Sequence, residues 1–222
     1  MGHSIKPWHK TWWAGMLLVF ATFILIILVA VGFYIYDSVK TAKKTSGVKL
    51  SGQTYSAAVG EHYWLGSAKP KITIVEFGDF ACSNCKKSFS TIREISLKYK
   101  NDIKFIWRDY PVVSEYSALL ALGGRCAGEQ GLFWPMHDKL FQNQGVSMAD
   151  QLAALAGQIG ADATRFNDCL TKQKYLTQIQ TDLQDGQKFS LSGTPAWFIN
   201  GYKVEGDIPY DTFIKIIEEL KK

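Results

Sequence analysis

The sequence predicts an α/β fold: a central mixed β-sheet with flanking helices, an inserted α-helical subdomain at about 115–189, and one transmembrane helix before the domain. Three observations lead to this prediction. An uncharged apolar stretch lies near the N-terminus, a β-branched run leads directly into a Cys-x-x-Cys, and Asn200-Gly201 separates two short strand-like runs. Long apolar stretches span bilayers, β-branched runs favour strands, and Asn-Gly is a strong hairpin signal.

The apolar stretch extends from Thr11 to Tyr36 and is long enough to cross the hydrocarbon core of a bilayer. A cleaved signal peptide is the alternative, since Lys6 and Lys10 resemble its basic n-region. However, the apolar run is longer than that of an ordinary signal peptide, and no Ala-x-Ala motif precedes the polar side. The segment that follows is polar, basic and without apolar periodicity. We therefore expect a short tail at 1–11, an uncleaved anchor at 12–36 and a flexible linker at 37–60.

The remaining positions, 61–222, are numerous enough for one domain with its own hydrophobic core. The whole chain has a formal net charge of +5, and its basic residues form no stripe. Such a mild, dispersed charge does not indicate nucleic-acid binding, so we expect no nucleic-acid partner.

The Cys-x-x-Cys is Cys82-Ser83-Asn84-Cys85, which lies between a strand-like run at 72–77 and a helix-like pattern. The N-terminus of a helix favours a thiolate, the attacking species in disulfide exchange, so this position predicts a redox-active pair. Half of a zinc site is one alternative, but a second pair of ligands at the required spacing is missing from the sequence. An inert structural disulfide is the other alternative, and it does not require a strand that leads into a helix.

The elements after this motif follow from periodicity. Ile103, Phe105 and Trp107 alternate as in a strand, and the residues from about 115 to 189 form a run of short helices. Asn200-Gly201 joins two hairpin strands, and Pro209 begins a last helix. The apolar residues that predict these helices are Leu152, Leu155, Ile159, Leu176, Ile179, Leu183, Phe213, Ile216, Ile217 and Leu220.

This order of elements is that of the thioredoxin fold with a helical insertion. Over about 61–222 the chain resembles the DsbA-like thiol-disulfide oxidoreductases, whose helical insertion caps the redox site. Three motifs in the same order carry the resemblance: Val75-Glu76-Phe77 before the Phe80–Cys85 segment, Arg108-Asp109-Tyr110-Pro111, and the Gly193–Gly201 segment. The resemblance implies an extracytoplasmic enzyme without a cofactor or metal. It also implies two kinds of partner, client proteins with thiols or disulfides and a membrane redox partner, either a quinone-linked reoxidant or a thiol reductant.

The same resemblance implies roles for individual residues. Cys82 matches the nucleophile and Cys85 the resolving cysteine, while Pro195 matches a cis-proline next to which the backbone of Thr194 is free to pair with an extended substrate. Glu76 matches a buried acid that moves a proton to or from the resolving thiol, with Arg108 as a counter-charge. The alternative for Glu76 is a strand-edge glutamate in water.

Ser83-Asn84 departs from the Pro-His dipeptide of the best-known oxidases in this family, which leaves the direction of electron flow open. We expect an oxidative enzyme. The alternatives are a disulfide isomerase or reductase, or a non-catalytic thioredoxin-fold module that binds clients or metal.

The other two cysteines, Cys126 and Cys169, lie in the helical block. An even number of cysteines in an extracytoplasmic domain favours a second, structural disulfide, and two buried free thiols are the alternative.

The thiol chemistry also decides the expected orientation in the membrane. Counted alone, the lysines favour a cytoplasmic C-terminal domain, because more of them follow the apolar stretch than precede it. A long folded domain can be translocated despite its charge, and disulfide exchange belongs in an oxidising compartment. We therefore expect a single-pass protein of the cell membrane with an extracytoplasmic C-terminal domain.

Overall fold

The structure, a computed structural model, describes residues 9–44 and 52–221, which belong to two compact units. The first unit is one helix, α1 (His9–Lys44). Within it, Gly15–Asp37 is long and apolar enough to cross a membrane. The expected span at 12–36 lies inside this helix, and most of the expected tail at 1–11 lies outside the described residues. Helix α1 is thus a candidate membrane span.

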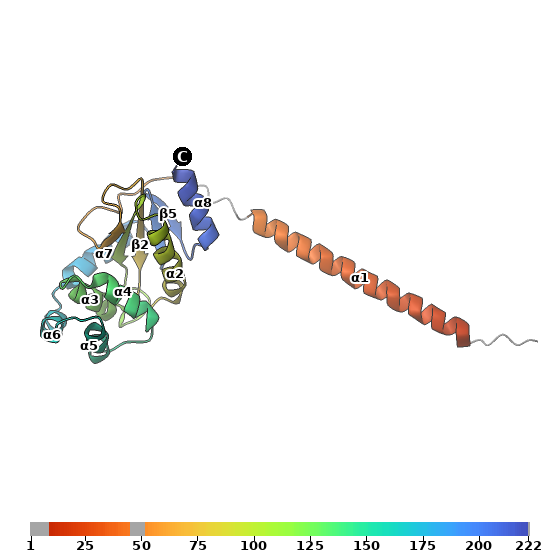
Figure 1. Cartoon of the computed structure of the whole chain (residues 1–222), viewed down its shortest axis with the longest axis horizontal. Helices are drawn as coiled ribbons and strands as arrows, with labels where there is room; N and C mark the ends of the chain where they lie inside the picture. Colours follow the sequence, from red (N-terminus) through yellow and green to blue (C-terminus); the bar gives the residue numbers. More distant parts are fainter. Residues whose placement is uncertain (1–8, 45–51, 222) are drawn as a thin grey trace, which may run out of the picture. The chain divides into compact units, whose positions relative to one another are not determined.

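The second unit is built on a mixed five-stranded sheet, as predicted (Figure 1). Its strand order is β1-β3-β2-β4-β5; β2 and β3 are parallel and the other neighbouring pairs are antiparallel. The strands are β1 (Trp64–Gly66), β2 (Ile72–Gly78), β3 (Ile103–Asp109), β4 (Ala196–Ile199) and β5 (Tyr202–Glu205). Strand β1 was not predicted, because three residues are too short to show an alternating pattern.

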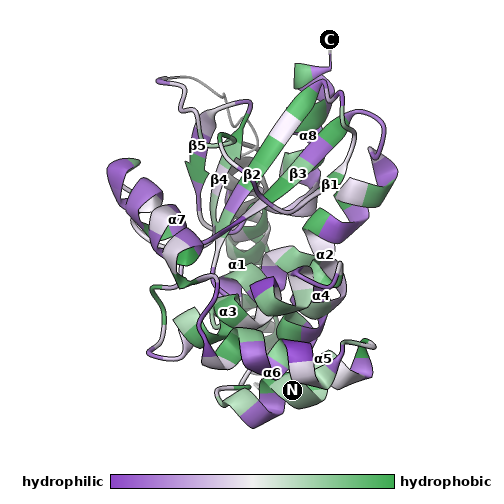
Figure 2. Cartoon of the chain, turned by 90° about the vertical axis from the view of Figure 1, so that its left-hand side faces the viewer, coloured by the Kyte–Doolittle hydropathy of each residue, from purple (hydrophilic) through white to green (hydrophobic). Residues whose placement is uncertain are grey.

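Seven helices accompany the sheet among the described residues of this unit. Five of them form the insertion that the sequence predicts, and α3, α4, α5 and α6 gather at one end of the sheet (Figures 1 and 2). The helices are α2 (Ser83–Lys98), α3 (Ser117–Gly128), α4 (Phe133–Gln142), α5 (Ala149–Gln158), α6 (Ala163–Thr171), α7 (Leu176–Lys188) and α8 (Tyr210–Leu220). Figure 2 shows that α3 is mostly hydrophobic and α7 mostly hydrophilic, which matches the burial of α3 on most of its surface.

The register of the sheet assigns each side chain to one of two faces. Val75 of β2 lies beside Ile106 and Phe198, and this face belongs to a hydrophobic cluster with Ala57. The next residue, Glu76, lies beside Trp107 and Trp197 on the opposite face. Since successive residues of a strand point to opposite sides, the two faces have separate cores.

The segment before the sheet differs from the expected linker at 37–60. Helix α1 continues to Lys44, and residues 45–51 lie outside the described residues. The rest of the segment packs on the domain: Thr54 forms a bridge with Tyr202, Tyr55 N–H donates to the Gly201 carbonyl at 2.9 Å, and Ala57 is 1% exposed. The Tyr55 ring also packs against Phe189 and Phe198, but this single aromatic residue and the small Ala57 form no periodic apolar pattern in the sequence.

Candidate active site

The Cys-x-x-Cys lies at the junction of β2 and α2. Strand β2 ends at Gly78 and α2 begins at Ser83, so Cys82 is the N-cap residue, with an extended backbone. Cys82 and Cys85 are both free thiols and both buried, at 6% and 0% exposure. Ser83 and Asn84 are exposed between them. The geometry therefore leaves Cys82 at the edge of the solvent and places Cys85 in the core.

Asp79 shapes the turn that leads to Cys82. One of its carboxylate oxygens accepts a hydrogen bond from the Ala81 N–H at 2.8 Å. The other accepts from the N–H groups of Val112 and Val113, each at 2.9 Å. Asp79 is thus a structural residue that joins the cysteine turn to the loop after β3.

Hydrogen bonds stabilise the ionised form of Cys82. The pKa of Cys82 is lowered to about 5, chiefly by a hydrogen bond from the Cys85 thiol and further by the Thr194 side chain and the N–H groups of Asn84 and Cys85. Burial acts in the opposite direction and is outweighed. At neutral pH Cys82 is therefore a thiolate, the form that attacks disulfides.

The surroundings of Cys85 shift its pKa in the opposite direction. Burial raises the pKa of the Cys85 thiol far above its ordinary value, and the hydrogen bond that the thiol donates to Cys82 raises it further. Cys85 therefore remains protonated, and it needs a proton whenever it leaves a disulfide.

Glu76 is a candidate source of that proton. It is 2% exposed, and burial raises the pKa of its carboxyl well above the ordinary value, with a further contribution from the Cys82 thiolate. A buried, protonated carboxyl group near Cys85 is able to donate to a leaving thiolate. The burial also excludes the alternative of a strand-edge glutamate in water.

The prediction that Arg108 is the counter-charge of Glu76 is wrong. Arg108 is in register with Phe77, so its side chain lies on the other face of the sheet and packs over the Phe77 ring. There it pairs with Asp182 at 2.7 Å and Asp185 at 2.6 Å. Arg125 and Asp109 complete this buried ionic cluster. The cluster ties β3 to α3 and α7.

Thr194 and Pro195 lie directly at the cysteines, although 112 residues separate Thr194 from Cys82 in the sequence. The peptide bond between Thr194 and Pro195 is cis. In its thiol form, Cys82 donates a hydrogen bond to the Thr194 carbonyl oxygen at 3.2 Å. The structure thus brings the predicted residues Glu76, Cys82, Cys85, Thr194 and Pro195 together.

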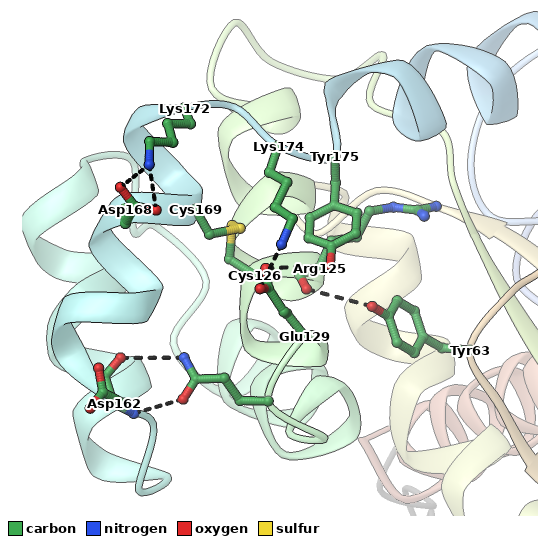
Figure 3. Close-up of a disulfide and its surroundings, with 11 residues drawn as sticks. Tyr63, Arg125, Cys126, Glu129, Asp162, Asp168, Cys169, Lys172, Lys174 and Tyr175 are labelled. Carbon is green, nitrogen blue, oxygen red and sulfur yellow. Dashed lines mark hydrogen bonds and ion pairs between the residues drawn. A yellow bond between two sulfur atoms is a disulfide. The ribbon is translucent and has the colours of Figure 1, made fainter.

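The second cysteine pair forms a disulfide away from this junction (Figure 3). Cys126 of α3 and Cys169 of α6 have an S–S distance of 2.03 Å and a Cα–Cα distance of 5.7 Å. Close by, Lys174 contacts Glu129 at 2.6 Å (Figure 3). Both sulfurs are buried, so this disulfide joins two helices of the insertion and offers no accessible thiol.

One residue of the site had no signal in the sequence. Gln144, in the loop between α4 and α5, donates hydrogen bonds to the carbonyl oxygens of Phe80 and Cys82. A polar residue in a loop some 60 positions away matches no motif of the cysteine turn. Across residues 9–44 and 52–221, no cluster of three or more His, Cys, Asp or Glu residues is arranged to hold a metal ion.

Comparisons with known proteins agree with this geometry. A family model described as Thioredoxin matches residues 58–219. The oxidised form of BdbD from Bacillus subtilis is 27% identical, with a TM-score of 0.67 over 78% of this chain and 98% of that chain. A periplasmic thioredoxin-like protein from Salmonella enterica serovar Typhimurium is 25% identical, with a TM-score of 0.64 over 77% of this chain and 100% of that chain. The thiol-disulfide exchange protein α-DsbA2 from Wolbachia pipientis shares the fold at 21% identity, with a TM-score of 0.66 over 72% of this chain and 87% of that chain.

Similar sequences also occur within longer proteins. The Na(+)/H(+) antiporter NhaA 1 of Salinispora arenicola is 34% identical over 143 residues, which cover 64% of this chain and 22% of the antiporter. This chain thus spans only about a quarter of the length of the curated relatives it matches. The family match covers most of the chain and includes the sheet, the cysteines and the cis-proline, so the chain belongs to the thioredoxin family, with the fold of the DsbA-like thiol-disulfide oxidoreductases.

Proposed function

We propose that this protein is a membrane-anchored thiol-disulfide oxidoreductase that oxidises the thiols of extracytoplasmic client proteins. One observation supports the proposal most: the contrast between a low-pKa Cys82 at the edge of the solvent and a buried, high-pKa Cys85 three residues later. A stabilised Cys82 thiolate favours the reduced enzyme, and an enzyme whose reduced form is stabilised is a strong oxidant.

In the proposed cycle, a client thiolate attacks the Cys82 sulfur of the Cys82–Cys85 disulfide. The S–S bond breaks, Cys85 leaves with the electron pair, and Glu76 supplies its proton. A second client thiolate then attacks the client sulfur of the mixed disulfide, and Cys82 leaves as a stable thiolate. Two client thiols have become one disulfide, and the enzyme disulfide has become a Cys82 thiolate and a Cys85 thiol, while Glu76 regains its proton from the solvent. A membrane redox partner that accepts two electrons restores the enzyme disulfide, and the Cys85 proton is released.

The surface beside the cysteines supports binding of an extended client. Val112 and Val113 are 47% and 51% exposed, and their N–H groups are bound by Asp79 of the cysteine turn. An apolar surface next to the nucleophile favours unfolded segments, which expose apolar side chains. The backbone of Thr194, next to the cis-proline, provides groups for pairing with such a segment.

A trapping experiment tests the catalytic proposal. In the variant Cys85→Ala, a mixed disulfide on Cys82 cannot be released by the resolving thiol, so client proteins accumulate on Cys82. The variant in which Cys82 is also replaced by alanine is the control and should trap nothing. Catalysis is the wrong function class if Cys85→Ala traps no client in growing cells.

Two further measurements test the direction and the compartment. A strongly oxidising reduction potential of the Cys82–Cys85 pair supports the oxidase, whereas a strongly reducing one supports the reductase. Helix α1 supports membrane anchoring, and an impermeant thiol reagent should label Cys82 in intact cells. Labelling only after lysis would place the domain in the cytoplasm.

A further inference from the structure

The loop between α4 and α5 holds the cysteine turn through one side chain. The Gln144 Nε2 atom lies 3.0 Å from the Phe80 carbonyl oxygen and 2.7 Å from the Cys82 carbonyl oxygen. An amide NH2 group has two hydrogens, so both donors of Gln144 are used on the two carbonyls that flank Ala81. The next residue, Gly145, has φ +112, a conformation that favours glycine and lets the loop turn away directly after this contact.

The N–H groups of the same turn have a different partner. Asp79 accepts the Ala81 N–H through its carboxylate and the Cys82 N–H through its carbonyl oxygen at 3.0 Å. The turn is therefore held by two groups: Asp79 binds its donors, and Gln144, from the helical insertion, binds its acceptors.

The Cys82 carbonyl has a special position in this arrangement. It also accepts the first hydrogen bond of helix α2, from the Lys86 N–H at 3.1 Å. The orientation of this carbonyl fixes the peptide plane between Cys82 and Ser83, and with it the start of the helix. The N–H groups of Asn84 and Cys85, which stabilise the Cys82 thiolate, belong to the same first turn.

We propose that Gln144 is a positioning residue, which fixes the Cys82 carbonyl so that the first N–H groups of α2 face the Cys82 sulfur. Gln144 acts through the backbone and does not touch the sulfur. The helical insertion thereby sets the reactivity of the thiol. The inference rests on the proposed function only where it concerns catalysis, because the pKa of Cys82 is measured on the protein without a client.

Substitutions at position 144 test this role through the pKa of Cys82. A lysine retains hydrogen-bond donors and adds positive charge, alanine removes the donors, and an ionised glutamate has no donor and repels both carbonyls. The order of Cys82 pKa values should therefore be Gln144→Glu highest, Gln144→Ala next, and wild type and Gln144→Lys lowest. Because a charge at position 144 also acts directly on the Cys82 thiolate, the neutral variant Gln144→Ala carries the test of the hydrogen bonds, and the charged variants show whether position 144 reaches the thiolate at all.

The experiment uses the reduced full chain in detergent and follows the ultraviolet absorbance of the Cys82 thiolate against pH. Gln144→Ala should raise the Cys82 pKa by about half a unit to one unit, the equivalent of one net hydrogen bond. The equilibrium with glutathione should shift by a comparable factor toward the oxidised protein. Gln142→Ala is the matched control, because Gln142 is an exposed glutamine at the end of α4.

Equal Cys82 pKa values in wild type, Gln144→Glu and Gln144→Lys would overturn the inference, whatever happens to the melting temperature. Glutamate has nearly the size of glutamine, so this comparison remains available if Gln144→Ala does not fold. The result is also separable from the proposed function. Normal client trapping with a flat pKa series rejects only the role of Gln144, and the expected pKa series without client trapping rejects only the catalysis.

Discussion

Ionisation of Cys82 should make the stability of the reduced protein depend on pH. The pKa of Cys82 falls from 9.0 to about 5 in the folded protein. A group whose pKa is lowered by folding contributes stability above its unfolded pKa and loses that contribution as the pH falls to its folded pKa. The contribution is therefore complete above about pH 9, partial at pH 7, and absent below about pH 5.

The magnitude follows from the size of the shift. Each pH unit between the two pKa values changes the free energy of unfolding by about 1.4 kcal/mol, which amounts to roughly 3 kcal/mol between pH 5 and pH 7. The Cys82 sulfur lies at the edge of the solvent, which screens its interactions, so we expect about half of that value. Glu76 contributes with the opposite sign, because its pKa is raised by burial and stability is lost as the pH rises above its unfolded pKa.

The assay is denaturant unfolding of the reduced chain in detergent between pH 5 and pH 8, with wild type compared with Cys82→Ser. The serine variant keeps Glu76 and lacks the titrating thiol, so the difference between the two proteins reports the ionisation of Cys82 together with its coupling to Glu76. We expect the wild type to gain about 1–2 kcal/mol over the serine variant between pH 5 and pH 7. Parallel curves for the two proteins would refute the low pKa of Cys82 and, with it, the main support for an oxidase.

Three further perturbations have definite expected outcomes. Replacing Glu76 with glutamine should slow disulfide exchange and flatten its pH profile, measured by stopped-flow, because Cys85 loses its proton donor. The same variant should unfold at higher denaturant concentration at pH 7, because the folded protein no longer buries an acid whose pKa is raised by burial. Asp182→Ala should cost about 3–5 kcal/mol in denaturant unfolding, because Arg108 and Arg125 each lose a buried ion-pair partner. Replacing both Cys126 and Cys169 with serine should cost about 4 kcal/mol for a loop of this length and leave the Cys82 pKa, followed by thiolate absorbance, unchanged.

Each of these predictions has a control or a contradicting outcome. Asp168 pairs with Lys172 in solvent, so Asp168→Ala should cost less than about 1 kcal/mol, and an equal loss in both aspartate variants would contradict the importance of burial. An unchanged pH profile in Glu76→Gln would remove Glu76 from the proton transfer. A shifted Cys82 pKa in the variant that lacks the Cys126–Cys169 disulfide would mean that this disulfide is part of the redox site.

The features with local causes were predictable from the sequence. Strand-like runs, the cysteine pair before a helix, and the hairpin at Asn200-Gly201 depend on residues that are near each other in the chain. Pro195 was found through a motif of neighbouring residues. The fold class needed only the order of these elements, and the mixed sheet with its helical insertion confirmed it.

The features with distant causes were not predictable. Whether Arg108 faces Glu76 depends on the register of β2 and β3, and a shift of one residue would exchange the faces. The packing of Ala57, the ionic cluster around Asp182, and the contact of Gln144 with Cys82 each join segments that no sequence pattern connects. The chain sequence thus determined which thiol pair is the candidate redox pair, because a strand, a turn and a helix are local. Only the tertiary structure decided which groups surround that pair, because hydrogen bonds, burial and charge depend on distance in space.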